Sequence, residues 1–212
     1  MRISALKPQR RSKKRLSVFV DGEYAFSLDR ETVAQFRLKA GTRVDPKLLE
    51  QIVLEEQFRH CRDDAFRLLS YRARSEKELR ERLDKKGYSP EIVEKVLARL
   101  QELGIVDDEK LARDYVEARI TVGHKGKFRV KQELLKKGIA PETVLTALQT
   151  APSELAAARM VLEHHLPRYR RLDPQTRLRR LYGLLARRGF AADTIDQVLR
   201  QYRQDTSQNL LT

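Results

Sequence analysis

Three glycines, Gly87, Gly138 and Gly189, recur along this 212-residue chain at a constant interval of 51 residues. Each stands four residues after a leucine and directly after two basic residues, and an amphipathic stretch follows each one. A glycine just past a helix end adopts the left-handed conformation that a Cβ would disfavour. The chain therefore predicts a unit of helix, glycine C-cap, short turn and helix, repeated three times.

A further helical stretch precedes each of these pairs, at about residues 65–71, 111–120 and 155–164. Because three helices can enclose a small core, we expect three-helix repeats. Repeats of this kind in tandem predict an elongated array. The boundaries that we expect for the three repeats are 63–107, 108–152 and 153–212.

The part of the chain before the repeats holds its strongest strand signal. Residues 16–20 and 23–28 are rich in β-branched and aromatic side chains and flank Asp21-Gly22, a pair that favours a two-residue hairpin turn. Residues 2–6 could add a third strand, because an isolated hairpin is marginally stable. The fold class that we expect is mainly α, with an N-terminal hairpin or small sheet.

The N-terminal segment is also basic, with seven Lys or Arg and no acid in residues 2–15. It is interpreted either as a solvated arm or as a segment that lies on phosphate. Residues 1–62 as a whole are expected to contain this basic arm, the hairpin and linking helices.

Several short patterns predict where helices begin. Asp45-Pro46 is typical of an N-cap followed by proline in the first turn, and Ser75 with Glu78 forms a capping-box pattern. The acidic run 107–109 suggests either a magnesium site or a helix N-terminus, and we favour the helix N-terminus because acidic side chains stabilise that end of a helix.

The amino-acid composition limits the classes of function that the chain can have. Lys and Arg number 44 against 30 Asp and Glu, which gives a net charge of +14 and predicts attraction to a polyanion such as nucleic acid. No apolar run has the length of a signal peptide or a membrane span, so we expect a soluble, cytoplasmic chain.

The single cysteine, Cys61, excludes an internal disulfide and is expected to be a buried small hydrophobe. Since the chain shows no paired carboxylates, nucleophile with its base, or metal ligands at suitable spacing, we expect no enzyme, no cofactor and no metal.

The candidate binding residues follow from helical faces. Around residues 178–188, Leu178, Leu181 and Leu185 share one face, so Arg180 and Arg187 point outward. A shift of 51 residues gives the equivalent outward positions in the second repeat, Arg129 and Lys136. The first repeat has Glu78 and Lys85 there, so the outward basic pair belongs to the last two repeats.

Two connectors add further basic residues. Six Lys or Arg against one acid lie in residues 121–140, and eight Arg against two acids in residues 163–190. The connector at residues 121–127 lacks the spacing of a phosphate-binding P-loop, but its lysines could contact the phosphates of a nucleic-acid backbone. A simply solvated basic face stays open as the alternative. The candidate connector residues are Lys125, Lys127, Arg168, Arg170 and Arg171.

Aromatic residues are interleaved with the basic ones, as in single-strand binders. At helical spacing we expect most of them in the core, with Tyr169, in the Arg168–Arg171 loop, as the candidate for stacking on a base. The set comprises Tyr71, Tyr88, Tyr115, Phe128, Tyr169 and Tyr182.

Three motifs in the repeats are distinctive: Tyr71-Arg-Ala-Arg-Ser-Glu-Lys-Glu-Leu through Gly87, Gly104-Ile-Val-Asp-Asp-Glu-Lys-Leu-Ala112, and Lys136-Lys-Gly138-Ile. Through these motifs, residues 63–202 resemble the RecX family, the bacterial regulators of the RecA recombinase. The hairpin at Val20-Asp-Gly-Glu-Tyr-Ala-Phe26 is similar to the amino-terminal extension of many members. The third repeat lacks the proline that follows the other two glycines.

The resemblance implies a non-enzymatic protein of tandem three-helix repeats that lodges in the RecA filament groove, and we expect the chain to be a monomer. It would suppress strand exchange, ATP hydrolysis and co-protease activity, and so act in recombination, DNA repair and the SOS response. Its partners would be the RecA filament and single-stranded DNA, with double-stranded DNA as a further option. The alternative is a general single-stranded DNA- or RNA-binding helical repeat protein that acts without RecA.

Overall fold

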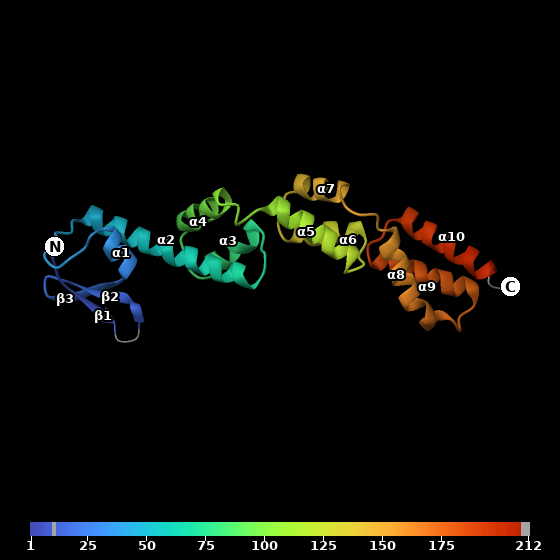
Figure 1. Ribbon diagram of the computed structural model, residues 1–212, viewed down its shortest axis with the longest axis horizontal. Helices are drawn as coiled ribbons and strands as arrows, with labels where there is room; N and C mark the ends of the chain where they lie inside the picture. The colour runs from blue at the N-terminus through green and yellow to red at the C-terminus, as the bar shows by residue number, and fades with distance from the viewer. Residues whose placement is uncertain (10–11, 209–212) are drawn as a thin grey trace. The chain divides into compact units, whose positions relative to one another are not determined.

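The computed structural model describes residues 1–9 and 12–208. The chain divides into two compact units, the first comprising residues 1–72 and 79–103, and the second comprising residues 73–78 and those from 104 onward. Three strands come first in the chain, and among the described residues only helices follow them. Figure 1 shows this sheet near the N-terminus. The expected fold class, helical three-helix repeats preceded by a small sheet, is confirmed.

The sheet is antiparallel with the order β1-β2-β3, formed by β1 (Ile3–Gln9), β2 (Ser12–Val20) and β3 (Glu23–Asp29). Asp21 and Gly22 form the predicted turn, with φ of 49° and 96°. The predicted hairpin and third strand are thus confirmed. The described part of the basic N-terminal segment belongs to β1 and β2 and is not a free arm, whereas Arg10 and Arg11 lie outside the described residues.

One long helix connects the sheet to the first repeat. After α1 (Arg30–Gln35), helix α2 (Pro46–Tyr71) begins where predicted, with Asp45 accepting a hydrogen bond from the Leu48 amide at 2.7 Å. Its Ile52 packs in the core under the sheet, and its Cys61 is fully buried further along. Burial, followed by the charges of Asp64 and Asp84, raises the pKa of Cys61 to about 12, so the thiol stays protonated.

The first repeat combines the end of α2 with α3 (Glu76–Asp84) and α4 (Pro90–Glu102). The predicted capping box is present: the Glu78 amide donates to Ser75 Oγ at 3.2 Å, and the Ser75 amide donates to Glu78 Oε2 at 3.3 Å. Gly87 ends this helix with φ of 89°, as predicted. The buried apolar side chains are Leu79, Leu83, Ile92, Val93, Val96, Leu97 and Leu100.

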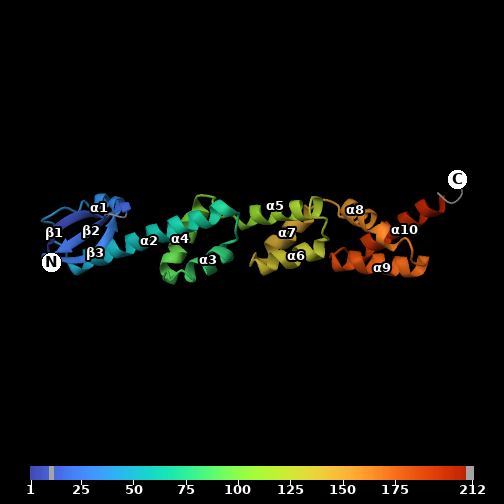
Figure 2. The same cartoon turned by 90° about the horizontal axis from the view of Figure 1, so that it is seen from below.

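The buried side chains of the second and third repeats form one core. Figure 2 shows the helices of these two repeats, α5 to α10. The second contains α5 (Asp108–Thr121), α6 (Lys127–Lys136) and α7 (Pro141–Gln149). The third contains α8 (Leu155–His165), the 3-10 helix η1 (Leu166–Tyr169), α9 (Pro174–Arg187) and α10 (Ala192–Gln208). Gly138 and Gly189 have φ of 82° and 86°, which confirms the remaining glycine C-caps.

Consecutive repeats are joined by hydrogen bonds to backbone carbonyls, and these bonds also recur after 51 residues. The Ser75 hydroxyl donates to the Lys137 carbonyl at 2.5 Å, and the Gly126 amide donates to the Arg188 carbonyl at 3.0 Å. Ser75 and Gly126 each precede the second helix of a repeat, and each contacts the turn that ends the second helix of the next repeat. The glycine turn therefore serves both as a helix cap and as a docking point.

At each of these two contacts between consecutive repeats, here called junctions, an acidic side chain also accepts a hydrogen bond. Asp108 accepts the Glu76 amide at 3.0 Å, and buried Glu154 accepts the Lys127 amide at 2.6 Å; Glu76 and Lys127 are again 51 residues apart. Asp107, not Asp108, caps its own helix by accepting the Lys110 amide at 2.8 Å. The helix-N-terminus interpretation of the acidic run is thus confirmed, with Asp108 assigned to the neighbouring repeat.

Candidate functional site

Two of the predicted basic residues of the second repeat, Lys125 and Arg129, pair with one glutamate. Glu133 accepts Lys125 Nζ at 2.8 Å, Arg129 Nε at 3.1 Å and the Tyr115 hydroxyl at 2.9 Å. Burial alone would raise the pKa of Glu133, but these three donors hold it below its ordinary value. The positive charges of Lys125 and Arg129 are therefore partly used inside the repeat.

Lys127 also has an internal role. Its amide is held by Glu154, and its ammonium donates to the Leu148 carbonyl at 3.2 Å. Lys136 differs, because it is exposed and no side-chain partner is found for it among the described residues. Of the four basic residues predicted in this repeat, only Lys136 leaves its whole charge to solvent.

The predicted residues of the third repeat are exposed. On α9, Leu181 and Leu185 are fully buried while Arg180 and Arg187 are exposed, so the predicted orientation of this helix is confirmed. Within the part of the chain that the structure describes, no ion pair or hydrogen bond engages the guanidinium groups of these arginines or of those in the connector, which are Arg168, Arg170 and Arg171. Arg177 is the contrast, since it donates to the carbonyls of Arg170 and Leu172, each at 2.9 Å.

Three further arginines did not emerge from the sequence pattern. Arg179 on α9 and Arg200 and Arg203 on α10 line a groove of about 490 Å³ between the two helices, together with Tyr182. Extending the helical-face argument to α10 would have found the last two, because Ile195 and Val198 mark its buried face and the arginines lie off it. The third repeat thus carries more basic charge beside this groove than the pattern of α9 alone indicates.

The aromatic residues are distributed differently from the expectation. Tyr71 and Phe128 are 78% and 66% exposed, and Tyr182 is 39% exposed, so the prediction that most of the set is core is wrong for these three. Tyr169, the expected stacking residue, is half-buried and packs against the shared core. Tyr182 is therefore a better candidate for stacking, because its ring is exposed beside arginines.

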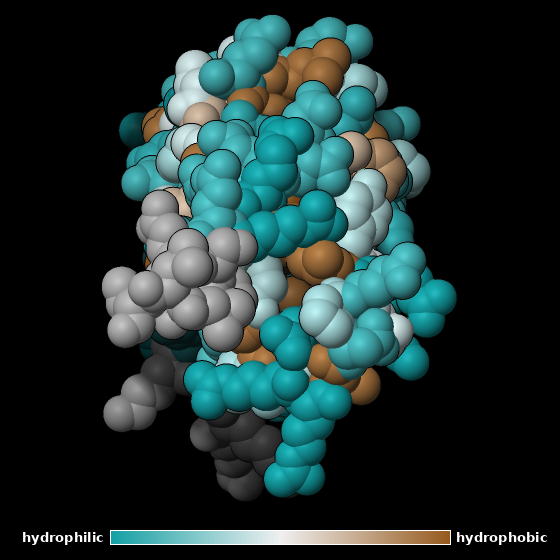
Figure 3. Space-filling model, turned by 90° about the vertical axis from the view of Figure 1, so that its right-hand side faces the viewer, coloured by the Kyte–Doolittle hydropathy of each residue, from teal (hydrophilic) through white to brown (hydrophobic). Residues whose placement is uncertain are grey.

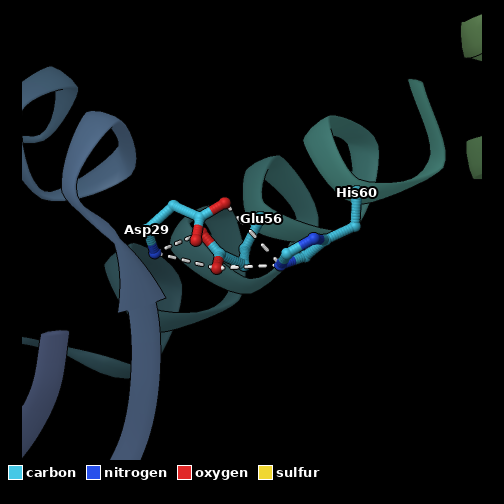
Figure 4. A group of neighbouring side chains, drawn as sticks. All are labelled: Asp29, Glu56 and His60. Carbon is cyan, nitrogen blue, oxygen red and sulfur yellow. Dashed lines mark hydrogen bonds and ion pairs between the residues drawn. The ribbon is translucent and has the colours of Figure 1, made fainter. Parts of the chain in front are cut away.

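One cluster has the residue types of a metal site. Asp29, Glu56 and His60 bring their ligand atoms within 4.8 Å of one another (Figure 4). Glu56, however, already accepts the Asp29 amide at 2.9 Å and the Thr32 hydroxyl at 2.6 Å, and an Arg15 guanidinium nitrogen lies 3.5 Å from it. The guanidinium already supplies the positive charge that a cation would bring, so the cluster is explained as an internal link between the sheet, α1 and α2.

No helix among residues 1–9 and 12–208 has the length and apolar character needed to cross a membrane. Figure 3 looks at the side on which α9 and α10 lie in Figure 1. Hydrophilic side chains cover most of that face, and apolar ones show between them in patches. The fold and this surface place the chain in the class of helical-repeat proteins with an exposed basic surface.

Comparison with known proteins narrows that class. Four family models match in order: the N-terminal domain of regulatory protein RecX over residues 1–45, and its first, second and third three-helix domains over 61–100, 107–148 and 153–199. The chain belongs to the RecX family of regulatory proteins.

Individual relatives agree. The regulatory protein RecX of Bacillus subtilis strain 168 is 30% identical over 99% of this chain and 81% of its own length. That of Geobacillus sp. strain WCH70 is 31% identical over 96% and 77%. A crystal structure of regulatory protein RecX superposes with a TM-score of 0.74 and 28% identity, over 94% of this chain and 98% of that one.

Glu133 provides a test of the second-repeat cluster. We expect Glu133→Gln to destabilise the second unit by about 1–2 kcal/mol at pH 7, because the charged partner of Lys125 and Arg129 is removed. Since the pKa of Glu133 is lowered in the fold, its stabilisation is complete above the ordinary value of 4.5 and disappears as the pH falls through the lowered pKa. The urea denaturation midpoints of the variant and the wild type should therefore become equal once the pH is below the lowered pKa of Glu133.

The matched control is Glu117→Gln, which removes the same charge from an exposed position in the same repeat. It should change the urea midpoint little at either pH. An equal loss of stability in both variants would contradict the assigned role of Glu133.

Proposed function

We propose that this chain binds the RecA nucleoprotein filament and inhibits its recombinase, ATPase and co-protease activities. Membership of a family of regulatory proteins named RecX supports a role in the control of RecA. The proposal goes beyond that name in stating the target, the filament, and the effect, inhibition.

The observation that carries the proposal is the unpaired arginine surface of the third repeat. Arg168, Arg170, Arg171, Arg180 and Arg187 are exposed, and the described residues offer them no acidic partner. Five side chains that stay charged at any physiological pH attract a polyanion, and the filament supplies one as DNA phosphate and acidic protein surface. The charge therefore remains available for an external partner.

We also propose that the chain acts by binding and not by catalysis. Three enclosed glutamates, Glu56, Glu133 and Glu154, each accept several internal hydrogen bonds. A carboxylate that is already saturated with donors is poorly suited to take a proton from a substrate. These residues are better explained by the stability of the sheet for Glu56, of the second repeat for Glu133, and of the junction between the second and third repeats for Glu154.

The test measures the DNA-dependent ATP hydrolysis of RecA on saturating single-stranded DNA while this protein is titrated in. We expect hydrolysis to fall at protein concentrations well below that of RecA. Naked single-stranded DNA is then added in excess to preformed filaments. Inhibition that persists supports filament binding, whereas inhibition that disappears in proportion to the added DNA indicates the alternative, a general single-strand binder. Unchanged hydrolysis throughout would contradict the proposal.

A further inference from the structure

The groove between α9 and α10 has the composition of a nucleotide site. Its floor is apolar, formed by Leu178 and Leu199, and its rim carries Arg179, Arg200 and Arg203. Tyr182 and Asp196 complete the lining. Its volume of about 490 Å³ lies within the ~300–1,000 Å³ that is typical of small-ligand sites.

Several polar side chains in this groove are not engaged by other side chains of the described protein. For Arg179, Tyr182, Asp196 and Arg200, the described part of the chain provides no hydrogen bond or ion pair. Arg159 on α8 of the same repeat behaves differently, because it pairs with Glu163 at 3.0 Å. The groove therefore presents both charge and hydrogen-bonding capacity to solvent.

We propose that this groove is a nucleotide subsite for single-stranded DNA. The exposed ring of Tyr182 would stack on one base, and the arginines around it would contact the flanking phosphates. A duplex offers no free base face, which excludes it from the stacking contact. Three arginines against one carboxylate give the complementary charge for a phosphodiester backbone.

Asp196 adds a preference among bases. A carboxylate in the groove can accept a hydrogen bond from an exocyclic amino group, which cytosine and adenine carry and thymine lacks. Thymine offers only its ring N3–H, which lies between two keto oxygens that repel a carboxylate, so its hydrogen bond to Asp196 would be weaker. The subsite should therefore favour cytosine over thymine, and the preference should depend on Asp196.

This inference deepens the proposed function, because it assigns a DNA contact to the regulator, but it is tested without RecA. Binding of the full chain to fluorescein-labelled 15-nucleotide oligo-dC and oligo-dT is measured by anisotropy. We expect Tyr182→Ala to weaken oligo-dC binding by about fivefold or more, as for the removal of one stacked base. Tyr182→Phe should stay within about twofold of wild type, since phenylalanine also stacks.

The arginines and the carboxylate are tested separately. Arg179→Gln with Arg200→Gln should flatten the slope of log affinity against log salt by up to about 0.7 for each phosphate that the variant no longer neutralises. Arg113→Gln is the matched control, because it removes an exposed arginine that pairs with Glu109 outside the groove. Asp196→Asn should reduce the difference between oligo-dC and oligo-dT.

The outcomes separate the subsite from the proposed function. If Tyr182→Ala does not fold, the double arginine variant, whose side chains are exposed, decides. Wild-type binding by Tyr182→Ala and the double arginine variant would overturn the subsite, as would absence of oligonucleotide binding by the wild type. RecA inhibition by the wild type would then still support the proposed function.

Discussion

Replacing Gly126 with alanine should separate the second repeat from the third and destabilise the second unit by about 3 kcal/mol. A Cβ at this position would lie 2.1 Å from the carbonyl carbon and oxygen of Gly189 and 2.2 Å from the Phe190 nitrogen. These are backbone atoms and cannot rotate away, so the two segments must part. The hydrogen bond from the Gly126 amide to the Arg188 carbonyl and that from the Phe128 amide to the Gly189 carbonyl would then break.

The comparison that isolates this effect is Gly87→Ala. A Cβ on Gly87 would have no heavy atom within 4 Å, so only the left-handed backbone, at about 1–2 kcal/mol, opposes it. Urea denaturation and hydrogen exchange of α6 and α9 measure both variants. A destabilisation at Gly126 no larger than that at Gly87 would contradict the close approach of the two backbones.

The glycine pattern shows how far local sequence reasoning extends. Gly87, Gly138 and Gly189 are equivalent in sequence, and all three adopt the left-handed conformation that their position after a helix predicts. They differ in what surrounds them: Gly87 faces open space, Gly138 faces the Lys77 side chain, and Gly189 faces the backbone of Arg129. A cap depends on its own helix, whereas the contact depends on a segment about 60 residues away.

The candidate binding residues likewise have different neighbours although the repeat makes their positions equivalent. The leucine periodicity of α9 fixes which way Arg180 and Arg187 point, because both belong to one helix. The shift of 51 residues then made Arg129 equivalent to Arg180, although Arg129 lies next to Glu133 and pairs with it. Position 184, the third-repeat equivalent of 133, is leucine, so the neutralising partner exists in only one repeat. A repeat predicts equivalent positions, but it does not predict equivalent neighbours.

The groove between α9 and α10 is harder to predict from the sequence than the direction of a single side chain. Arg179 and Arg200 are 21 residues apart and lie on opposite sides of the Gly189 turn. Their meeting depends on how two helices pack through Leu185, Ile195 and Leu199. Helix faces can be predicted one at a time, but a groove requires the angle between two of them.

Reversing four unpaired arginines of the third repeat should greatly weaken filament binding while leaving the fold intact. The variant changes Arg170, Arg171, Arg180 and Arg187 to glutamate. All four are exposed, and the leucines that hold α9 in place, Leu181 and Leu185, are untouched. Arg129 is kept, since a glutamate there would lie beside Glu133 and destabilise α6 by repulsion between like charges. Half-maximal inhibition of RecA ATP hydrolysis should then need about ten times more protein or more.

A charge-matched control separates local contact from net charge. Lys39, Lys47, Arg82 and Lys85 are exposed in the first unit, and changing them to glutamate alters the net charge by the same amount. If the third repeat touches the filament, the control should inhibit nearly as well as wild type, and only the third-repeat variant should show a weaker salt dependence, by up to about 0.7 in slope per single-strand phosphate. Equal weakening in the two variants would assign the effect to the net charge, and full inhibition by the third-repeat variant would mean that these arginines form only a solvated face.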